Sequence, residues 1–210
     1  MSIPIGPADR RHFPALRAIE LASFETLRAA GAVSGEAVAS TDAEWQLYLD
    51  AGFLLAAFAA RAVPVGYGGG YGAEGWLHIG EVGVQPAWQR KGLGRRLLHA
   101  LLDAGRARKL KGATLTTDRL APFNAPFYAS LGFQMLEGEA CPARLQAILA
   151  AEQANGLDPL RRVAMQQRAW LAPRDQAAVG AVAAVGEALD QVTHTGRKRQ
   201  FAQFAARRAN

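Results

Sequence analysis

The residues best suited to chemistry stand between Val82 and Leu98, in the stretch VGVQPAWQRKGLGRRLL. Two glycines lie one residue apart among basic side chains, and an apolar helical pattern follows directly. Glycine lets the backbone approach a ligand closely, and the first turn of a helix presents unpaired N–H groups at the positive end of its dipole. The stretch therefore predicts a site for an anion, and phosphate suits it best. The residues expected to bind are Gln89, Arg90, Lys91, Gly92, Leu93, Gly94 and Arg95.

This stretch does not match two common phosphate-binding patterns. A P-loop needs Gly-x-x-x-x-Gly-Lys-Ser/Thr, which the sequence lacks, and a dinucleotide fingerprint needs glycine where Leu97 stands. It does match Gln/Arg-x-x-Gly-x-Gly/Ala, and NAPFYASLGF follows from Asn124 onward. In these features, across Trp76 to Gln134, the chain resembles the GCN5-related N-acetyltransferase (GNAT) family. That family has this acetyl-CoA-binding pattern and a following helix that ends in Tyr-x-x-x-Gly-Phe.

The resemblance implies a mixed α/β fold with a mostly antiparallel central sheet flanked by helices. It also implies a V-shaped gap where the strand LHIGEVGV parts from the strand ATLTT. The pantetheine arm of acetyl-CoA would lie in the gap against the backbone of Val82 and Val84, and the amides of residues 90–95 would hold the pyrophosphate. Asn124 matches a position that often binds the cofactor arm, although asparagine also caps helices well.

Two side chains are candidates for catalysis. Tyr128 matches the tyrosine that protonates the departing thiolate in similar enzymes, and a phenol with a pKa near 10 is protonated at neutral pH. Glu81 is the candidate base, and strand alternation places it on a mostly apolar face with Leu77 and Ile79. The alternative for Tyr128 is a packing role in a short helix, and the alternative for Glu81 is a salt bridge to a lysine or arginine of a helix. The implied reaction is direct acetyl transfer in a ternary complex, without a covalent intermediate on Cys141.

Hydrophobic periodicity predicts the elements that position these residues. An extended start is expected at Ser2–Ala8, and three strands are expected within Phe53–Val84, with turns near Arg61–Pro64 and Gly72–Gly75. The further strands expected are Ala113–Thr117, Phe133–Leu136 and Arg161–Leu171. The helices expected are Asp9–Ala30, Ala43–Gly52, Gly92–Lys109, Asn124–Gly132 and Ala143–Gly156.

Bulk properties narrow the class of protein. The chain has 210 residues, a net charge of +6 and a pI of about 10.0, a balance that favours anionic partners. A single cysteine excludes an intrachain disulfide, the N-terminus does not resemble a signal peptide, and the apolar runs are too short to span a bilayer. We therefore expect a cytoplasmic protein without a membrane partner. The histidines lack metal-ligand spacing, so no metal is expected.

The chain is predicted to divide into a GNAT domain at 1–173 and a helical, basic, partly disordered tail at 174–210. A small-molecule amine is the expected acceptor, with a protein or peptide amine as an alternative. The loop with Asp118 and Arg119, together with His78, is a candidate to shape its pocket. Two other functions stay open, namely a non-catalytic CoA sensor and a basic tail that binds nucleic acid, although nucleic acid is the less favoured partner. A homodimer is a further option.

Overall fold

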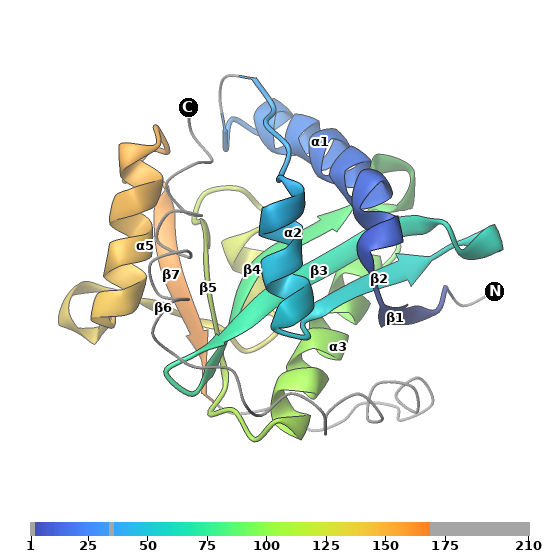
Figure 1. Cartoon of the computed structure of the whole chain (residues 1–210). Coiled ribbons are helices and arrows are strands. Elements are labelled where there is room, and N and C mark those ends of the chain that lie inside the picture. The colour runs from blue at the N-terminus through green and yellow to red at the C-terminus, as the bar shows by residue number, and fades with distance from the viewer. Residues whose placement is uncertain (1–2, 34–35, 169–210) are drawn as a thin grey trace.

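A seven-stranded sheet in the order β1-β2-β3-β4-β5-β7-β6 forms the centre of the protein (Figure 1). The computed structural model describes residues 3–33 and 36–168. Within them every pair of neighbouring strands is antiparallel except β4 and β5, which are parallel. The expected mostly antiparallel α/β fold is thereby confirmed. The strands are β1 (Ile5–Pro7), β2 (Leu54–Phe58), β3 (Pro64–Ala73), β4 (Trp76–Val84), β5 (Ala113–Asp118), β6 (Gln134–Leu136) and β7 (Arg162–Gln167).

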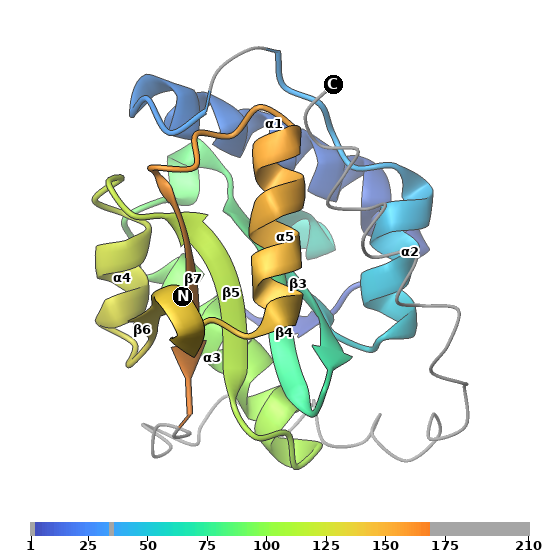
Figure 2. The same ribbon diagram turned by 90° about the vertical axis from the view of Figure 1, so that its left-hand side faces the viewer.

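Helices cover both faces of this sheet. Figure 1 shows α1 and α2 on one face and α3 on the other, and Figure 2 shows α5 beside β5 and β7. The α-helices are α1 (Phe13–Ala29), α2 (Asp42–Asp50), α3 (Leu93–Ala107), α4 (Ala125–Ala129) and α5 (Ala143–Ala154). Single turns of 3-10 helix are η1 (Arg10–His12), η2 (Ala60–Ala62), η3 (Pro86–Trp88) and η4 (Gly138–Ala140).

The α3 helix buries the leucine stripe that its sequence predicts. Leu98 and Leu101 are fully buried and pack in one cluster with Leu77 and Ile79 of β4 and Leu115 of β5. An amphipathic helix buries such a stripe against a sheet because each buried leucine contributes about 1.5–3 kcal/mol. This packing holds the start of α3 directly beyond the end of β4.

The opposite face is built on an aromatic cluster of α1 and α2, in which Trp45 and Tyr48 are fully buried. Tyr48 packs on bare backbone, because a Cβ added at Gly69 of β3 would lie 2.6 Å from its Cδ2 atom. A Cβ added at Gly80 of β4 would lie even closer to the Tyr48 hydroxyl. The glycines of β3 and β4 therefore let α2 lie close to the sheet.

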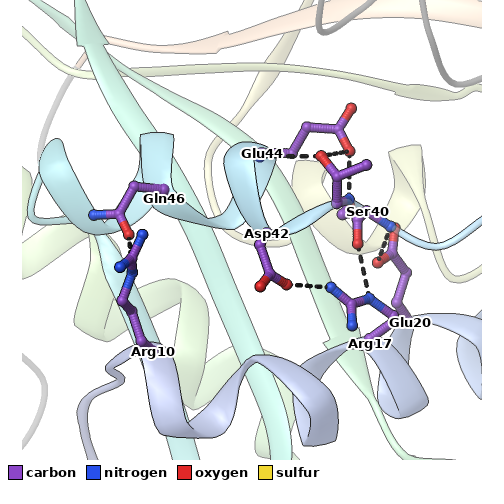
Figure 3. A network of polar contacts seen from close by, with 8 residues as sticks. Arg10, Arg17, Glu20, Ser40, Asp42, Glu44 and Gln46 are labelled. Atoms are coloured by element: carbon purple, nitrogen blue, oxygen red, sulfur yellow. Dashed lines mark hydrogen bonds and ion pairs between the residues drawn. The ribbon is translucent and has the colours of Figure 1, made fainter.

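A polar network joins the end of the α1–α2 connection to α1 (Figure 3). Glu20 of α1 is buried, and its carboxylate accepts hydrogen bonds of 2.9 Å from both the backbone N–H and the hydroxyl of Ser40. Arg17 donates to the Ser40 carbonyl at 2.9 Å and pairs with Asp42 at 2.5 Å. A buried carboxylate needs such donors, so this network fixes where α2 begins.

The chain order differs from the spatial order at the far edge of the sheet. The α5 helix lies between β6 and β7 in sequence, and β7 returns to pair with β5 on one side and β6 on the other. The predicted tail at 174–210 lies outside the described residues, so its extent stays a prediction. In the part of the chain that the structure describes, no helix is long and apolar enough to cross a membrane.

Candidate active site

A gap opens between β4 and β5. The two strands pair in register only at Leu77 with Ala113 and at His78 with Thr114. Beyond these pairs β4 continues to Val84 beside β3, whereas β5 continues to Asp118 beside β7. The strands therefore part toward their carboxyl ends, at the position that the family resemblance implies.

The backbone of β4 turns toward this gap at alternate residues. Gln85 N–H donates to the Val65 carbonyl of β3 at 3.0 Å, so the backbone groups of Val84 and Val82 point away from β3. The Val84 carbonyl accepts hydrogen bonds from the Ser23 hydroxyl at 3.2 Å and from the Gln89 amide at 2.9 Å. Val82 and the Val84 N–H are thus the backbone groups on which the predicted pantetheine contact depends.

The turn before α3 presents a row of backbone donors. Within the described residues, the N–H groups of 90–95 make no hydrogen bond to backbone or side chain, and the first such N–H of the helix to do so is that of Arg96, which donates to Gly92. Arg90 and Gly92 both have left-handed backbones, with φ of +57° and +78°. Alternation of this kind turns successive N–H groups to one side and forms a concave anion site.

Gly94 leaves space beside these donors. A Cβ added there would meet only the Cγ2 atom of Val84, at 3.8 Å, which is ordinary van der Waals contact. Glycine at this position is therefore not required by the packing of the protein itself. Its lack of a side chain is useful chiefly to a molecule that approaches the turn from outside.

The side chains of the turn have partners within the protein. Gln89 also donates to the Thr26 hydroxyl at 3.3 Å, so it fastens the turn to α1 as well as to β4. Lys91 donates to the Ala87 carbonyl at 2.8 Å and lies over the Trp88 ring. Arg95 donates to the hydroxyl of Ser130, the C-cap residue of α4, at 2.8 Å, and so links the start of α3 to the end of α4.

The short α4 helix carries the other two candidates. Asn124 occupies the N-cap position, yet its side chain makes no capping hydrogen bond. The Tyr128 ring packs against Phe127 and Phe133, at centroid distances of 5.4 and 5.9 Å. In residues 3–33 and 36–168 no group is hydrogen-bonded to the Tyr128 hydroxyl, which is consistent with a group that faces a substrate.

The electrostatics of Tyr128 tie it to the gap. Burial raises the pKa of its phenol to about 12, the positive charge of Arg162 opposes this rise, and the negative charge of Glu81 adds to it. The sequence offers no signal for Arg162, because its place near Tyr128 depends on the pairing of β7 with β5. At neutral pH Tyr128 is fully protonated and can act only as a proton donor.

The predicted orientation of Glu81 is wrong. Gly69 pairs with Glu81 and Gly70 with Ile79, so Gly80 is an extra residue that forms a β-bulge. The bulge changes the alternation, and Val82 joins Leu77 and Ile79 in the cluster on the α3 face. Glu81 consequently points to the face covered by α2 and α5. Tyr128 packs with the α3-face cluster, so the two candidates flank the gap from opposite sides.

Two other candidates have structural roles. Asp118 is buried, and it accepts hydrogen bonds of 2.7 Å from the N–H groups of Leu120 and Ala121 and pairs with Arg161 at 2.6 Å. Burial alone would raise the pKa of Asp118, but these donors hold it below its usual value. His78 is buried in the sheet at 3.1 Å from the Thr114 hydroxyl. Because Asp118 and His78 are both buried and have partners within the protein, neither side chain is exposed to contact an acceptor substrate.

Comparison with known proteins decides the family. A model of the acetyltransferase (GNAT) family matches residues 14–133, which is more than half of the chain. The chain belongs to the GNAT acetyltransferase family. Enzymes of this GNAT family take the acetyl group from acetyl-CoA, and the gap and the unpaired amides of this member suit a pantetheine arm and a pyrophosphate. Among the described residues, no group of three potential ligands could hold a metal ion.

Solved structures share the GNAT fold at low identity. The PaiA N-acetyltransferase of Thermoplasma acidophilum, solved with coenzyme A, has a TM-score of 0.61 and 16% identity, covering 80% of this chain and 100% of that one. N-acetylglutamate synthase of Neisseria gonorrhoeae, solved with coenzyme A and N-acetyl-glutamate, has a TM-score of 0.60 and 15% identity. The match covers 80% of this chain and 35% of that one. The ribosomal-protein-S18-alanine N-acetyltransferase of Escherichia coli has a TM-score of 0.54 and 17% identity. The match covers 81% of this chain and 96% of that one.

Proposed function

We propose that this GNAT member is an N-acetyltransferase that moves the acetyl group of acetyl-CoA directly to the primary amine of a small molecule. The observation that carries the proposal is the row of N–H groups at 90–95, which lack protein partners in the described residues and stand beyond the end of the gap. Gly92, Leu93, Gly94 and the backbone of Arg90, Lys91 and Arg95 would bind the pyrophosphate there. The Asn124 amide, which caps nothing, would bind the arm of the cosubstrate.

The two faces of the gap suit the two proton transfers of the reaction. Bound acetyl-CoA supplies a thioester, whose acetyl group passes to the amine as free thiol is released. Glu81, on the α2 and α5 face, would accept the proton that the amine loses as it forms its bond to the carbonyl carbon. The Val82 N–H would stabilise the charge that develops on the carbonyl oxygen. Tyr128, on the other face, would donate its proton to the departing sulfur.

The surroundings of Glu81 support a small acceptor. The Tyr48 hydroxyl of α2 lies against Gly80, the residue before Glu81. Arg144 of α5 approaches His78, three residues before Glu81, with Nη1 at 3.4 Å from the ring Nδ1. Two helices thus stand close to the face from which the amine must approach, and this restricts the size of the molecule that can enter.

The binding proposal is tested by replacing Gly94 with valine and titrating acetyl-CoA into the protein by calorimetry. Since a Cβ at Gly94 meets only one carbon at ordinary distance, the Gly94→Val protein should fold. Its affinity for acetyl-CoA should fall by at least about tenfold, because side-chain carbons would occupy the approach to the N–H groups. Gly72→Val, at an exposed glycine of β3 with nothing within 4 Å of an added Cβ, is the matched control. Unchanged affinity in Gly94→Val would refute the site.

The catalytic proposal is tested by Tyr128→Phe in a thiol-release assay with a panel of small amines. Phenylalanine keeps the ring contacts with Phe127 and Phe133, so acetyl-CoA affinity should not change. The turnover number should fall by about 10²- to 10⁴-fold, the usual contribution of a general acid. A variant that turns over at the wild-type rate would remove Tyr128 from the mechanism.

A further inference from the structure

A cavity lies between α5 and the outer strands β6 and β7. Its volume is about 340 Å³, and none of the residues predicted to bind acetyl-CoA lines it. Its apolar lining comes from Leu136 of β6, Cys141 before α5, Leu149 of α5 and Ala164 of β7. A cavity of this size lies at the lower end of the range for small-molecule sites, which is about 300–1,000 Å³.

Two arginines give the cavity a positive side. The Nε atom of Arg119 is buried and has no hydrogen-bond partner in the described residues, and its Nη2 atom lies 3.5 Å from the exposed Glu137 carboxylate. Arg162 uses its Nε and Nη2 atoms on Glu152, at 2.9 and 2.7 Å, and also lines the cavity. A buried guanidinium N–H without a partner is costly, and an anion that accepts from it removes that cost.

The charges that line the cavity favour an anion. Arg119 and Arg162 line it together with one carboxylate, that of Glu137. Glu137 is 70% exposed in its side chain, so water screens its pairing with Arg119. The carboxylate that faces Arg162 is Glu152, which also accepts a hydrogen bond from Thr116 at 2.7 Å and is committed to that network.

We propose that this cavity binds a small organic carboxylate, with its charged end on Arg119 and its apolar chain against Leu136, Cys141 and Leu149. A planar guanidinium matches a carboxylate well, and the apolar walls favour a hydrocarbon tail over a compact inorganic ion. The site is built by β6, α5 and β7, and none of the residues predicted to bind acetyl-CoA lines it, although Arg162 also acts on the pKa of Tyr128.

Cys141 provides a direct readout. It is the only cysteine of the chain and its side chain lines the cavity, so its alkylation by iodoacetamide reports on this place alone. Burial raises the pKa of the Cys141 thiol, so the labelling should be followed at mildly alkaline pH. Hexanoate is the probe, and hexan-1-ol and hexylamine are the uncharged and cationic controls.

Hexanoate should slow the alkylation of Cys141 in the full chain in a saturable way, and the two controls should not. Arg119→Gln should raise the hexanoate concentration needed for half protection by about tenfold or more, since it removes a charge-assisted pair. Arg28→Gln, at an exposed arginine of α1 paired with Glu25, is the matched control and should match the wild type.

The proposal is wrong if hexanoate gives no saturable protection, or if hexan-1-ol protects equally well. It is also wrong if Arg119→Gln leaves the half-protection concentration unchanged. Binding of acetyl-CoA by each variant serves only to show that it is folded. Because the readout does not use acetyl transfer, its result is independent of whether the proposed enzyme activity is found.

Discussion

Replacing His78 by glutamine should remove part of the acid sensitivity of the fold. His78 is 4% exposed, and its ring Nδ1 lies 3.1 Å from the Thr114 hydroxyl and 3.4 Å from Nη1 of Arg144. Burial, and to a lesser extent the charge of Arg144, lower the pKa of His78 from 6.5 to about 3. The folded protein therefore keeps this ring neutral at mildly acidic pH, whereas the unfolded chain protonates it.

The sign and size of the effect follow from this difference. The folded pKa is the lower one, so the unfolded state binds more protons between pH 6.5 and 3, and stability falls as the pH falls through that window. Because one proton is bound, the free energy of unfolding changes by at most about 1.36 kcal/mol per pH unit. The loss of stability between pH 7 and pH 5 is therefore about 2 kcal/mol. Above pH 7 this contribution is constant.

Urea unfolding followed by tryptophan fluorescence measures the effect. The free energy of unfolding is determined at pH 7 and pH 5 for the wild type and for His78→Gln, which is neutral at both. The wild type should lose about 2 kcal/mol more than the variant between the two pH values. His99→Gln, at a half-buried histidine of α3, should behave as the wild type. If His78→Gln loses as much stability as the wild type, the burial argument for this ring is refuted.

Three further predictions concern packing and catalysis. Ser40→Ala should lower the free energy of unfolding by about 1–3 kcal/mol, because it removes a hydrogen bond from the buried Glu20 carboxylate, and urea titration measures the loss. Gly112→Ala should cost about 1–3 kcal/mol or more, since its Cβ would overlap the Gln167 carbonyl of β7; an unchanged melting temperature would contradict this. If Tyr128 is the acid, with a pKa of about 12, the turnover number should stay level above pH 10, and an alkaline loss centred at pH 10 would argue against it.

The turn before α3 could be predicted in detail because its signals are local. A left-handed Gly92, the leucine stripe and the first-turn amides all depend on residues close together in sequence. The bounds of most strands and helices followed for the same reason. The gap itself depended on the family resemblance, since the parting of β4 from β5 is a long-range feature.

The face of Glu81 could not be predicted from alternation, because the extra residue at Gly80 depends on Tyr48 in another element. The charge of Arg162 near Tyr128 and the ion pair of Asp118 with Arg161 likewise depend on how β7 pairs with β5. Such misses share one cause. They concern contacts between segments far apart in sequence, on which a periodic pattern carries no information.

Because of the bulge at Gly80, odd-numbered side chains face the core beside α3 in the first half of β4, and even-numbered side chains do so in the second half. Before it, odd-numbered side chains such as Leu77 and Ile79 enter the core beside α3, and after it the even-numbered Val82 and Val84 do so. If Gly80 instead took a regular, paired place in the strand, simple alternation would turn Glu81 into the leucine-rich packing and Val82 outward. The bulge at this one glycine therefore determines that a carboxylate, and not a valine, lies on the α2 face of the sheet, from which we propose that the amine approaches.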